Sequence, residues 1–237
     1  MRVSALAVRT SGGVRERALT GVAELLGGVP GARATAARVR LTALGGGTAL
    51  LQANAEVRGH RIRAQVAAPE ADAAGLLRER VAAQVSRLDA PGAHRAWPGP
   101  DRAPVVTGRA GARRVARRKR VRAALCAPDA AALAMDLMDY DFHLFADSET
   151  GQDSVLYRVG PTGYRLARLE DTAPPALPVV VPLTTNVHPV PELTEAEAVR
   201  RLDETELPFR FFRQAGTRRG AVLYRRWDGD YGLLTSG

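Results

Sequence analysis

Three stretches of the chain alternate between apolar and polar residues, which is the pattern of β-strands that bury one face. These stretches are residues 34–44, 51–57 and 62–66. In the first of them, Val39 and Leu41 alternate with Arg38 and Arg40. Glycine-containing segments separate the three stretches, so we expect consecutive antiparallel strands joined by tight turns.

Two helices are predicted around these strands. Apolar residues recur at helical spacing over Ala71–Leu88 and over Val14–Leu26, where Ser11 can cap the helix and Gly27–Gly28 can end it. Arg2–Arg9 is a plausible first strand. The order β-α-β-β-β-α predicts an N-terminal α+β domain, in which two helices cover one face of a four-stranded sheet.

Strand alternation also determines where several arginines project. The face of the sheet opposite the apolar residues receives Arg38, Arg40, Arg61 and Arg63. Further arginines lie on the second helix, at Arg78, Arg80 and Arg87. Guanidinium groups match phosphate oxygens in pairs, which favours a polyanionic partner. A solvated face of an antiparallel sheet explains the same pattern equally well.

The second half of the chain contains an internal duplication. Val155–Arg158 and Val222–Arg225 have the same sequence, and the offset that carries Val155 onto Val222 is called the repeat offset below. Applied without gaps, it also places further positions on residues of the same type: Phe142 on Phe209, Phe145 on Phe212, Tyr164 on Tyr231 and Leu166 on Leu233. A repeat of this kind indicates one structural unit that is present twice.

Each copy is predicted to be a small domain of βαβββ type. In the first copy, Pro128 begins a helix, and strands follow at Phe142–Phe145, Val155–Arg158 and Tyr164–Arg168. In the second copy, Thr194 and Glu197 have the spacing of a helix capping box. The later dipeptide Asp228-Gly229, between two runs of β-forming residues, is a strong hairpin signal.

The two copies are predicted to pair with each other. A domain of about 50 residues is marginal for an independent core. Two copies in one chain can bury their aromatic strands against each other, in a pair related by pseudo-two-fold symmetry. The predicted contact surface consists of Phe142, Leu144, Phe145, Val155, Tyr157, Phe209, Phe211, Phe212, Val222 and Tyr224.

Charge and proline content divide the chain, whose net charge is +9. Residues 91–122 hold 10 Lys or Arg and one acid, whereas residues 123–237 hold 11 Arg and 17 acids. A basic front and an acidic back indicate a polyanion and a protein as partners. The predicted segments are a basic domain (1–90), a flexible basic linker (91–114), a first repeat (115–170), a proline-rich connector (171–191) and a second repeat (192–237).

The sequence contains no evident catalytic or metal-binding set, so we expect no enzyme, no cofactor, no metal and no small-molecule substrate. Gly45–Gly47 lacks the Lys-Ser/Thr and the following helix of a phosphate-binding loop. His60 lies in a predicted turn beside Arg58, without a second His or Cys nearby. Both turn residues are therefore expected to contact RNA or solvent.

The composition also indicates a compartment. Cys126 is the single cysteine, so no internal disulfide is possible and a reducing environment is expected. No apolar run approaches the length of a membrane span, so we expect a soluble, cytoplasmic protein without a membrane partner. Trp97 could stack on a base or pack on the protein, and the sequence favours neither.

The segment from Thr194 to Leu234 resembles the C-terminal domain of long ribosome hibernation-promoting factors, the sigma-54 modulation group. Three features carry the resemblance: the capped helix, Phe209–Phe212, and the hairpin around Asp228-Gly229-Asp230-Tyr231-Gly232. The element order and basic positions of residues 1–90 are similar to the N-terminal domain of that family. The first copy departs from the motif, with Pro161-Thr162-Gly163-Tyr164-Arg165 in place of Asp-Gly-x-Tyr-Gly.

The resemblance implies that the N-terminal domain binds rRNA of the small ribosomal subunit where mRNA and tRNA would lie, and so inhibits translation under stress. It implies an rRNA-binding set of Arg38, Arg40, Arg58, His60, Arg61, Arg63, Arg78, Arg80 and Arg87. In the family, a single C-terminal domain self-associates and joins two ribosomes. The duplication suggests pairing in cis and silencing of single ribosomes. The alternatives are trans pairing that dimerises ribosomes, a non-ribosomal transcription modulator, and a general RNA-binding stress protein.

Overall fold

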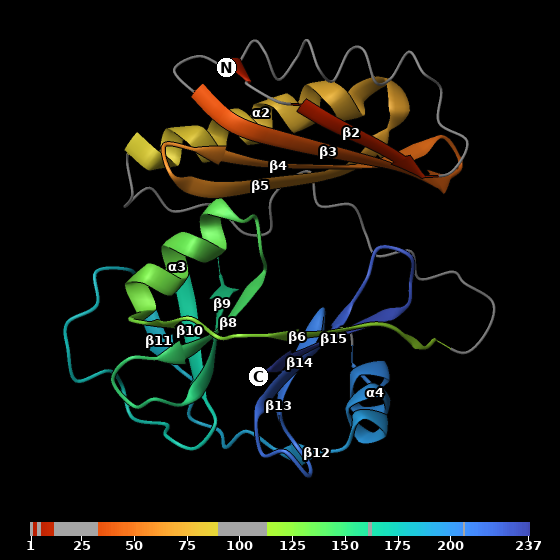
Figure 1. The fold of residues 1–237 in the computed structure, drawn as a ribbon. Helices are drawn as coiled ribbons and strands as arrows, with labels where there is room; N and C mark the ends of the chain where they lie inside the picture. Colours follow the sequence, from red (N-terminus) through yellow and green to blue (C-terminus); the bar gives the residue numbers. More distant parts are fainter. Residues whose placement is uncertain (1, 4–5, 12–32, 90–112, 161–162, 206) are drawn as a thin grey trace. The chain divides into compact units, whose positions relative to one another are not determined.

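The computed structural model describes residues 2–3, 6–11, 33–89, 113–160, 163–205 and 207–237 (Figure 1). The chain divides into two compact units, residues 1–103 with 133–140 and residues 104–132 with 141–237. The chain combines helices with mixed sheets whose central strands are antiparallel, so the fold class is α+β, as predicted.

The sheet of the first unit is built on β3 (Arg33–Gly45), β4 (Thr48–Val57) and β5 (His60–Pro69), which are consecutive antiparallel strands. Two further strands, β1 (Arg2–Val3) and β2 (Leu6–Ser11), run parallel to β3 on its other side. A parallel pair needs a crossover connection. The predicted helix Val14–Leu26 falls in that connection, outside the described residues.

The turn between β4 and β5 contains a glycine with a clear conformational role. Arg58 and Gly59 both have positive φ values, 51° and 77°. Two positive φ values in a two-residue loop match the twist of the flanking strands. Gly59 adopts this conformation without steric cost, whereas Arg58 does so as a residue with a side chain.

The core of the first unit lies between the sheet and α2 (Glu70–Asp89), which the sequence predicted to within one residue at each end. Leu77, Val81 and Val85 of α2 are buried in one cluster with Val39 and Leu51 of the sheet. The predicted alternation is confirmed in β3, where the apolar residues are buried while Arg38 and Arg40 are exposed.

The second unit contains two five-stranded sheets, one for each repeat. The first sheet has the order β11 (Leu183–Thr185), β10 (Gly163–Arg168), β9 (Asp153–Val159), β8 (Phe142–Asp147), β7 (Leu125–Cys126). The second has the order β12 (Glu192–Leu193), β13 (Phe209–Gln214), β14 (Gly220–Arg225), β15 (Tyr231–Ser236), β6 (Val115–Val121).

The repeats exchange their outer strands. β6 is the first strand of the first repeat in sequence but runs parallel to β15 of the second repeat, with Leu233 opposite Arg118. β11 precedes the second repeat but runs parallel to β10 of the first, with Leu166 opposite Thr185. The repeat offset converts one pairing into the other, so the exchange is reciprocal. The segment 171–191, which the sequence assigned to a connector, therefore contains a strand of the first sheet.

Each repeat also has one helix, α3 (Pro128–Leu137) in the first and α4 (Glu195–Asp203) in the second. The capping box of α4 is confirmed: the Thr194 N–H donates to Glu197 Oε2 at 2.9 Å, and the Glu197 N–H donates to Thr194 Oγ1 at 3.3 Å. The hairpin from β14 to β15 is also confirmed, and the turn is closed by an Arg226 N–H bond to the Asp230 carbonyl at 2.9 Å.

Candidate functional site

The face of the first sheet opposite α2 is polar. Strand register places Arg38, Asn54 and Arg63 opposite one another across β3, β4 and β5. The next row on the same face contains Arg40, Gln52 and Gln65. Adjacent strands lie about 4.8 Å apart, so the two rows form one surface of guanidinium and amide groups. Such groups donate hydrogen bonds to phosphate and to base edges.

The arginines of this face differ in exposure. Arg38, Arg40 and Arg61 are exposed, whereas Arg63 is half-buried. The Arg63 guanidinium donates to the side-chain oxygen of Gln65 and, at 3.4 Å, to Gln52 Oε1. Arg63 also donates to the Met138 carbonyl at 3.2 Å and lies 5.2 Å from the centre of the Tyr140 ring. Arg38 and Arg40, which are exposed, are therefore better placed than Arg63 to meet a ligand.

The turn residues Arg58 and His60 are both exposed at the end of the β4–β5 hairpin. Arg58 forms an ion pair with Asp89, the last residue of α2. Both partners are exposed, and exposed ion pairs contribute little to stability because water and salt screen them. The pair joins the turn to the end of the helix and partly neutralises Arg58.

The three arginines of α2 lie on a different surface from the sheet arginines, because α2 covers the opposite face of the sheet. Arg78 is exposed, and Arg80 and Arg87 are half-buried. Arg87 Nη1 donates to Gln84 Oε1 at 2.7 Å, and Gln84 is itself buried. The predicted rRNA-binding residues are thus divided between two surfaces. On the sheet surface, the arginines lie in adjacent rows across neighbouring strands.

A second basic surface follows β6 in the second unit. Arg117, Arg118, Lys119 and Arg120 are exposed along this edge strand. Arg118 Nε donates to Glu195 Oε2 at 3.0 Å, at the start of α4. The sequence did not predict this pairing, because the strand lacks apolar alternation. The duplication gave no signal either, because the residues that the repeat offset places on β6 share none of its residue types at matching positions.

The two repeats meet through aromatic and apolar side chains. The ring centroids of Phe142 and Phe209 lie 4.7 Å apart, and those of Tyr157 and Phe209 lie 5.5 Å apart in an edge-on arrangement. Tyr224 is also close to Phe142, at 5.8 Å between centroids. One cluster contains most of the predicted contact residues: Phe142, Leu144, Val155, Tyr157, Phe209, Phe211 and Val222, with Val121 and Leu234 in addition.

Phe145 and Phe212 have a different place from the one expected. Both are fully buried, and Phe212 lies in a cluster with Leu193 and Leu202 that is centred on the contact of its own sheet with α4. The physical reason is strand alternation. Phe145 and Phe212 have the opposite parity to Leu144 and Phe211, and so they project from the other face of their strands.

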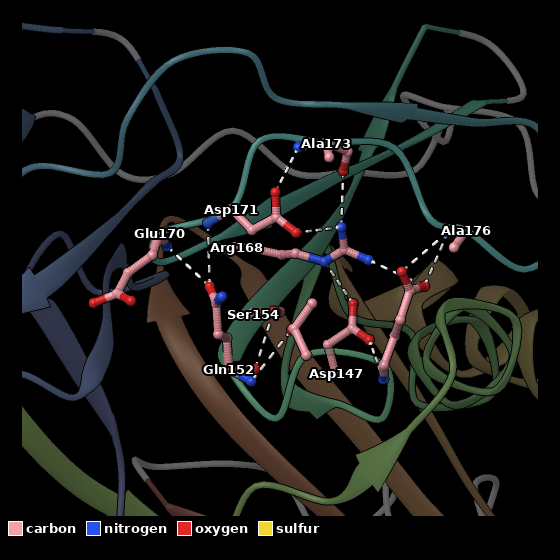
Figure 2. Close-up of polar contacts among 10 residues, drawn as sticks. Asp147, Gln152, Ser154, Arg168, Glu170, Asp171, Ala173 and Ala176 are labelled. Atoms are coloured by element: carbon pink, nitrogen blue, oxygen red, sulfur yellow. Dashed lines mark hydrogen bonds and ion pairs between the residues drawn. The ribbon is translucent and has the colours of Figure 1, made fainter.

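A buried arginine organises the first repeat (Figure 2). The side chains of Arg168 and Asp147 are fully buried, and Arg168 Nε lies 2.8 Å from Asp147 Oδ2. Arg168 Nη1 donates to the Ala173 carbonyl at 2.8 Å and lies 3.5 Å from Asp171 Oδ2. No sequence pattern indicated this contact, because a charged residue is ordinarily expected on the surface.

Cys126 and His143, two side chains of the second unit that could take part in chemistry, both lie at or in strands. Cys126 ends β7, where burial and, to a lesser extent, the Asp147 carboxylate raise the pKa of its thiol. Burial lowers the pKa of His143, whose ring stacks on Phe145. Among the described residues, no group of three or more His, Cys, Asp or Glu is placed to hold a metal ion. No helix in the described ranges is long and apolar enough to cross a membrane.

A family model described as "Sigma 54 modulation/S30EA ribosomal protein C terminus" matches residues 110–166 and again residues 179–233. The first match includes β6 and the second includes β11. Each exchanged strand therefore belongs to the matched domain of one repeat and completes the sheet of the other. The fold and its surfaces define a class of protein in which a basic-faced α+β unit precedes two paired copies of this domain.

The "Dormancy associated translation inhibitor" of Mycobacterium tuberculosis is 43% identical over 208 residues, which cover 84% of this chain and 76% of the relative. The same values hold for that protein in strains CDC 1551 and H37Rv. The chain belongs to the sigma 54 modulation/S30EA ribosomal protein family, in a form with two C-terminal domains.

Two solved structures resemble parts of the chain. A ribosomal subunit interface protein from Coxiella burnetii has 13% identity and a TM-score of 0.34, covering 36% of this chain and 98% of that chain. The N-terminal domain of Protein Y from Thermus thermophilus has 19% identity and a TM-score of 0.30, covering 37% and 99%.

Proposed function

We propose that this protein is a long-form ribosome hibernation factor, which binds ribosomes in the cytoplasm and inhibits translation during stress or dormancy. The relative that is 43% identical over 208 residues is named for dormancy and translation inhibition. The observation that carries the proposal here is the exposed pair Arg38 and Arg40 on a sheet whose other face is covered by α2. These two cations are thereby presented on the face of the sheet that α2 does not cover.

The N-terminal unit acts by occupancy and not by chemistry. Its sheet arginines place guanidinium groups against phosphates of small-subunit rRNA in the channel that mRNA and tRNA use. Arginine suits this role because its planar fork donates two parallel hydrogen bonds to one phosphate. Occupation of the channel excludes the substrates of translation, and no cofactor or bond-making step is needed.

The C-terminal repeats pair within one chain in this proposal, and the protein therefore silences single ribosomes. Two observations support it: Phe142 of the first repeat lies against Phe209 of the second, and β6 and β11 are exchanged between the sheets. A contact surface that is already filled in cis is closed to the repeat of another chain. Trans pairing, which would join two ribosomes, is the alternative outcome when ribosomes are sedimented with the protein.

Ribosome pelleting tests the rRNA surface. Arg38→Gln/Arg40→Gln removes two exposed cations, and we expect at least a tenfold weaker association with the small subunit at moderate salt. The slope of log affinity against log salt should fall by about one unit for each lost phosphate contact on duplex-like rRNA.

Arg200→Gln/Arg201→Gln is the matched control, because both side chains are exposed on α4 and the same charge is lost. This control should pellet with ribosomes as the unaltered protein does. Equal weakening by both double variants would mean that net charge and not the sheet surface determines binding, and the proposed site would be rejected.

A further inference from the structure

The contact between the repeats contains residues that face their own equivalents. Phe142 and Phe209 are related by the repeat offset, and their centroids lie 4.7 Å apart. Val155 and Val222 are related by the same offset and are buried in the same cluster. In a two-fold arrangement, a residue meets its own copy only near the symmetry axis. These pairs therefore mark the pseudo-two-fold axis of the second unit.

One axial pair is chemically unlike. The equivalent of Asp153 is Gly220, and the Gly220 N–H donates to Asp153 Oδ2 at 2.9 Å. A Cβ atom added to Gly220 would lie only 2.7 Å from the Cβ of Asp153. The side chain of Asp153 therefore occupies the space that its counterpart leaves empty.

The groups that donate hydrogen bonds or ion pairs to the Asp153 carboxylate in the contacts described here belong to the second repeat. Arg219 Nε lies 2.9 Å from Asp153 Oδ2, and the Ser236 hydroxyl donates to Asp153 Oδ1 at 2.7 Å. The first repeat has Gln152 at the position equivalent to Arg219, and Leu169 at the position equivalent to Ser236. Neither of these replaces the cation or the hydroxyl, so the duplication has diverged on both sides of the axis.

A second unlike contact crosses the same interface. Arg213 Nη2 of the second repeat lies 2.9 Å from Glu170 Oε1 of the first. The equivalents of these residues are Ala146 and Gly237, which carry no charged side chain. These two contacts have the same direction, with the acid from the first repeat and the arginine from the second, whereas the pair between Arg118 of the exchanged strand β6 and Glu195 has the opposite direction.

We propose that Asp153 and Gly220 determine which repeats pair: they favour the pairing of a first repeat with a second repeat and disfavour the pairing of two identical repeats. Two first repeats would bring two carboxylates together at the axis, which is unfavourable when they are removed from water. Two second repeats would leave an unfilled gap between glycines and an Arg219 without its carboxylate. The inference rests on the proposed pairing of the repeats and names the residues that determine which repeats pair.

The full-length chain can report the cost of each like pairing. Gly220→Asp gives the axis the composition of two first repeats, and Asp153→Gly gives it the composition of two second repeats. We expect Gly220→Asp to lower the melting temperature of the second unit by about 10 °C, because the new side chain overlaps that of Asp153 and adds a second buried carboxylate. The exchanged variant Asp153→Gly/Gly220→Asp again has one carboxylate facing one glycine, but its carboxylate has Gln152 and Leu169 in place of Arg219 and Ser236, so it should recover part of that loss.

Gly75→Asp is the control, since it adds a carboxylate on α2 where no atom lies within 4 Å of the new Cβ. It should change the melting temperature of the second unit by no more than about 2 °C. The inference is overturned if the exchanged variant is no more stable than Gly220→Asp, or if Gly220→Asp is tolerated. These measurements contain no ribosomes, so their failure is distinguishable from a failure of ribosome binding in the pelleting experiment.

Discussion

At the scale of single residues, burial separates side chains that the sequence presents as alike. Arg38 and Arg168 are both arginines on strands, yet the first is exposed on β3 and the second is buried beside Asp147. Period-two alternation predicted the first correctly. It could not predict the second, because a buried arginine is stabilised by partners that lie far away in the sequence. Phe145 and Phe212 were predicted on the contact face because they are aromatic. Their positions along the strands, which alternate with those of Leu144 and Phe211, place them on the opposite face.

The buried pair Arg168–Asp147 should be among the most sensitive positions of the first repeat. Arg168→Ala leaves the Asp147 carboxylate buried without its cation, and we expect a loss of about 3–5 kcal/mol in the free energy of unfolding. Urea unfolding followed by circular dichroism measures this. The exposed pair Arg226–Asp228 is the control, and Arg226→Gln should cost about 1 kcal/mol or less. Similar losses for both variants would contradict the structural role of Arg168.

At the scale of elements, local sequence patterns predicted most helices and strands. The pairing of β6 and β11 depends on partners that are distant in the sequence, so local patterns did not predict it. The predicted Ala71–Leu88 became α2, and the capping box at Thr194 marked the start of α4. β6 and β11 could not be predicted from alternation, because four consecutive basic residues form the middle of β6 and β11 has only three residues. Their partners lie in the other repeat, and no local pattern specifies which distant edge a strand will join.

Interrupting β6 should weaken the second repeat. The main chain of Val121 faces β15, accepting from the Gly237 N–H at 2.9 Å, and Lys119 has the same strand parity. Lys119→Pro removes a main-chain donor from this edge, so the melting temperature should fall by on the order of 5 °C. Hydrogen exchange should accelerate in β15 more than in β10.

Lys119→Gln is the matched control, because it removes the charge and keeps the N–H group. Its melting temperature and its exchange rates in β15 should stay close to those of the unaltered chain. If Lys119→Gln lowered the melting temperature as much as Lys119→Pro does, charge and not the strand pairing would account for the effect.

At the scale of the whole molecule, duplication changes what one domain can do. A family domain that occurs once must find its partner on another chain, whereas two copies on one chain can find each other. The linking segment keeps the second copy at a high effective concentration, which favours the pair within the chain over a pair between chains. The sequence was sufficient to predict the duplication, but not the exchange of strands that accompanies it.

Sedimentation of ribosomes distinguishes the two modes of pairing. When the protein is added in excess to single ribosomes, we expect the single-ribosome peak to persist while the protein sediments with it. The control is a mixture without the protein, run at the same salt concentration. A dominant peak of ribosome dimers that depends on the protein would reject pairing in cis.

The exchange of β6 and β11 also has a consequence for synthesis of the chain. β6 is translated before either repeat is complete, yet the strand it joins, β15, is among the last segments to be made. A nascent β6 therefore waits with an open edge while the rest of the second unit emerges. Its four consecutive basic residues, Arg117 to Arg120, suit that interval, because like charges keep an unpaired strand soluble and discourage premature association with other nascent chains.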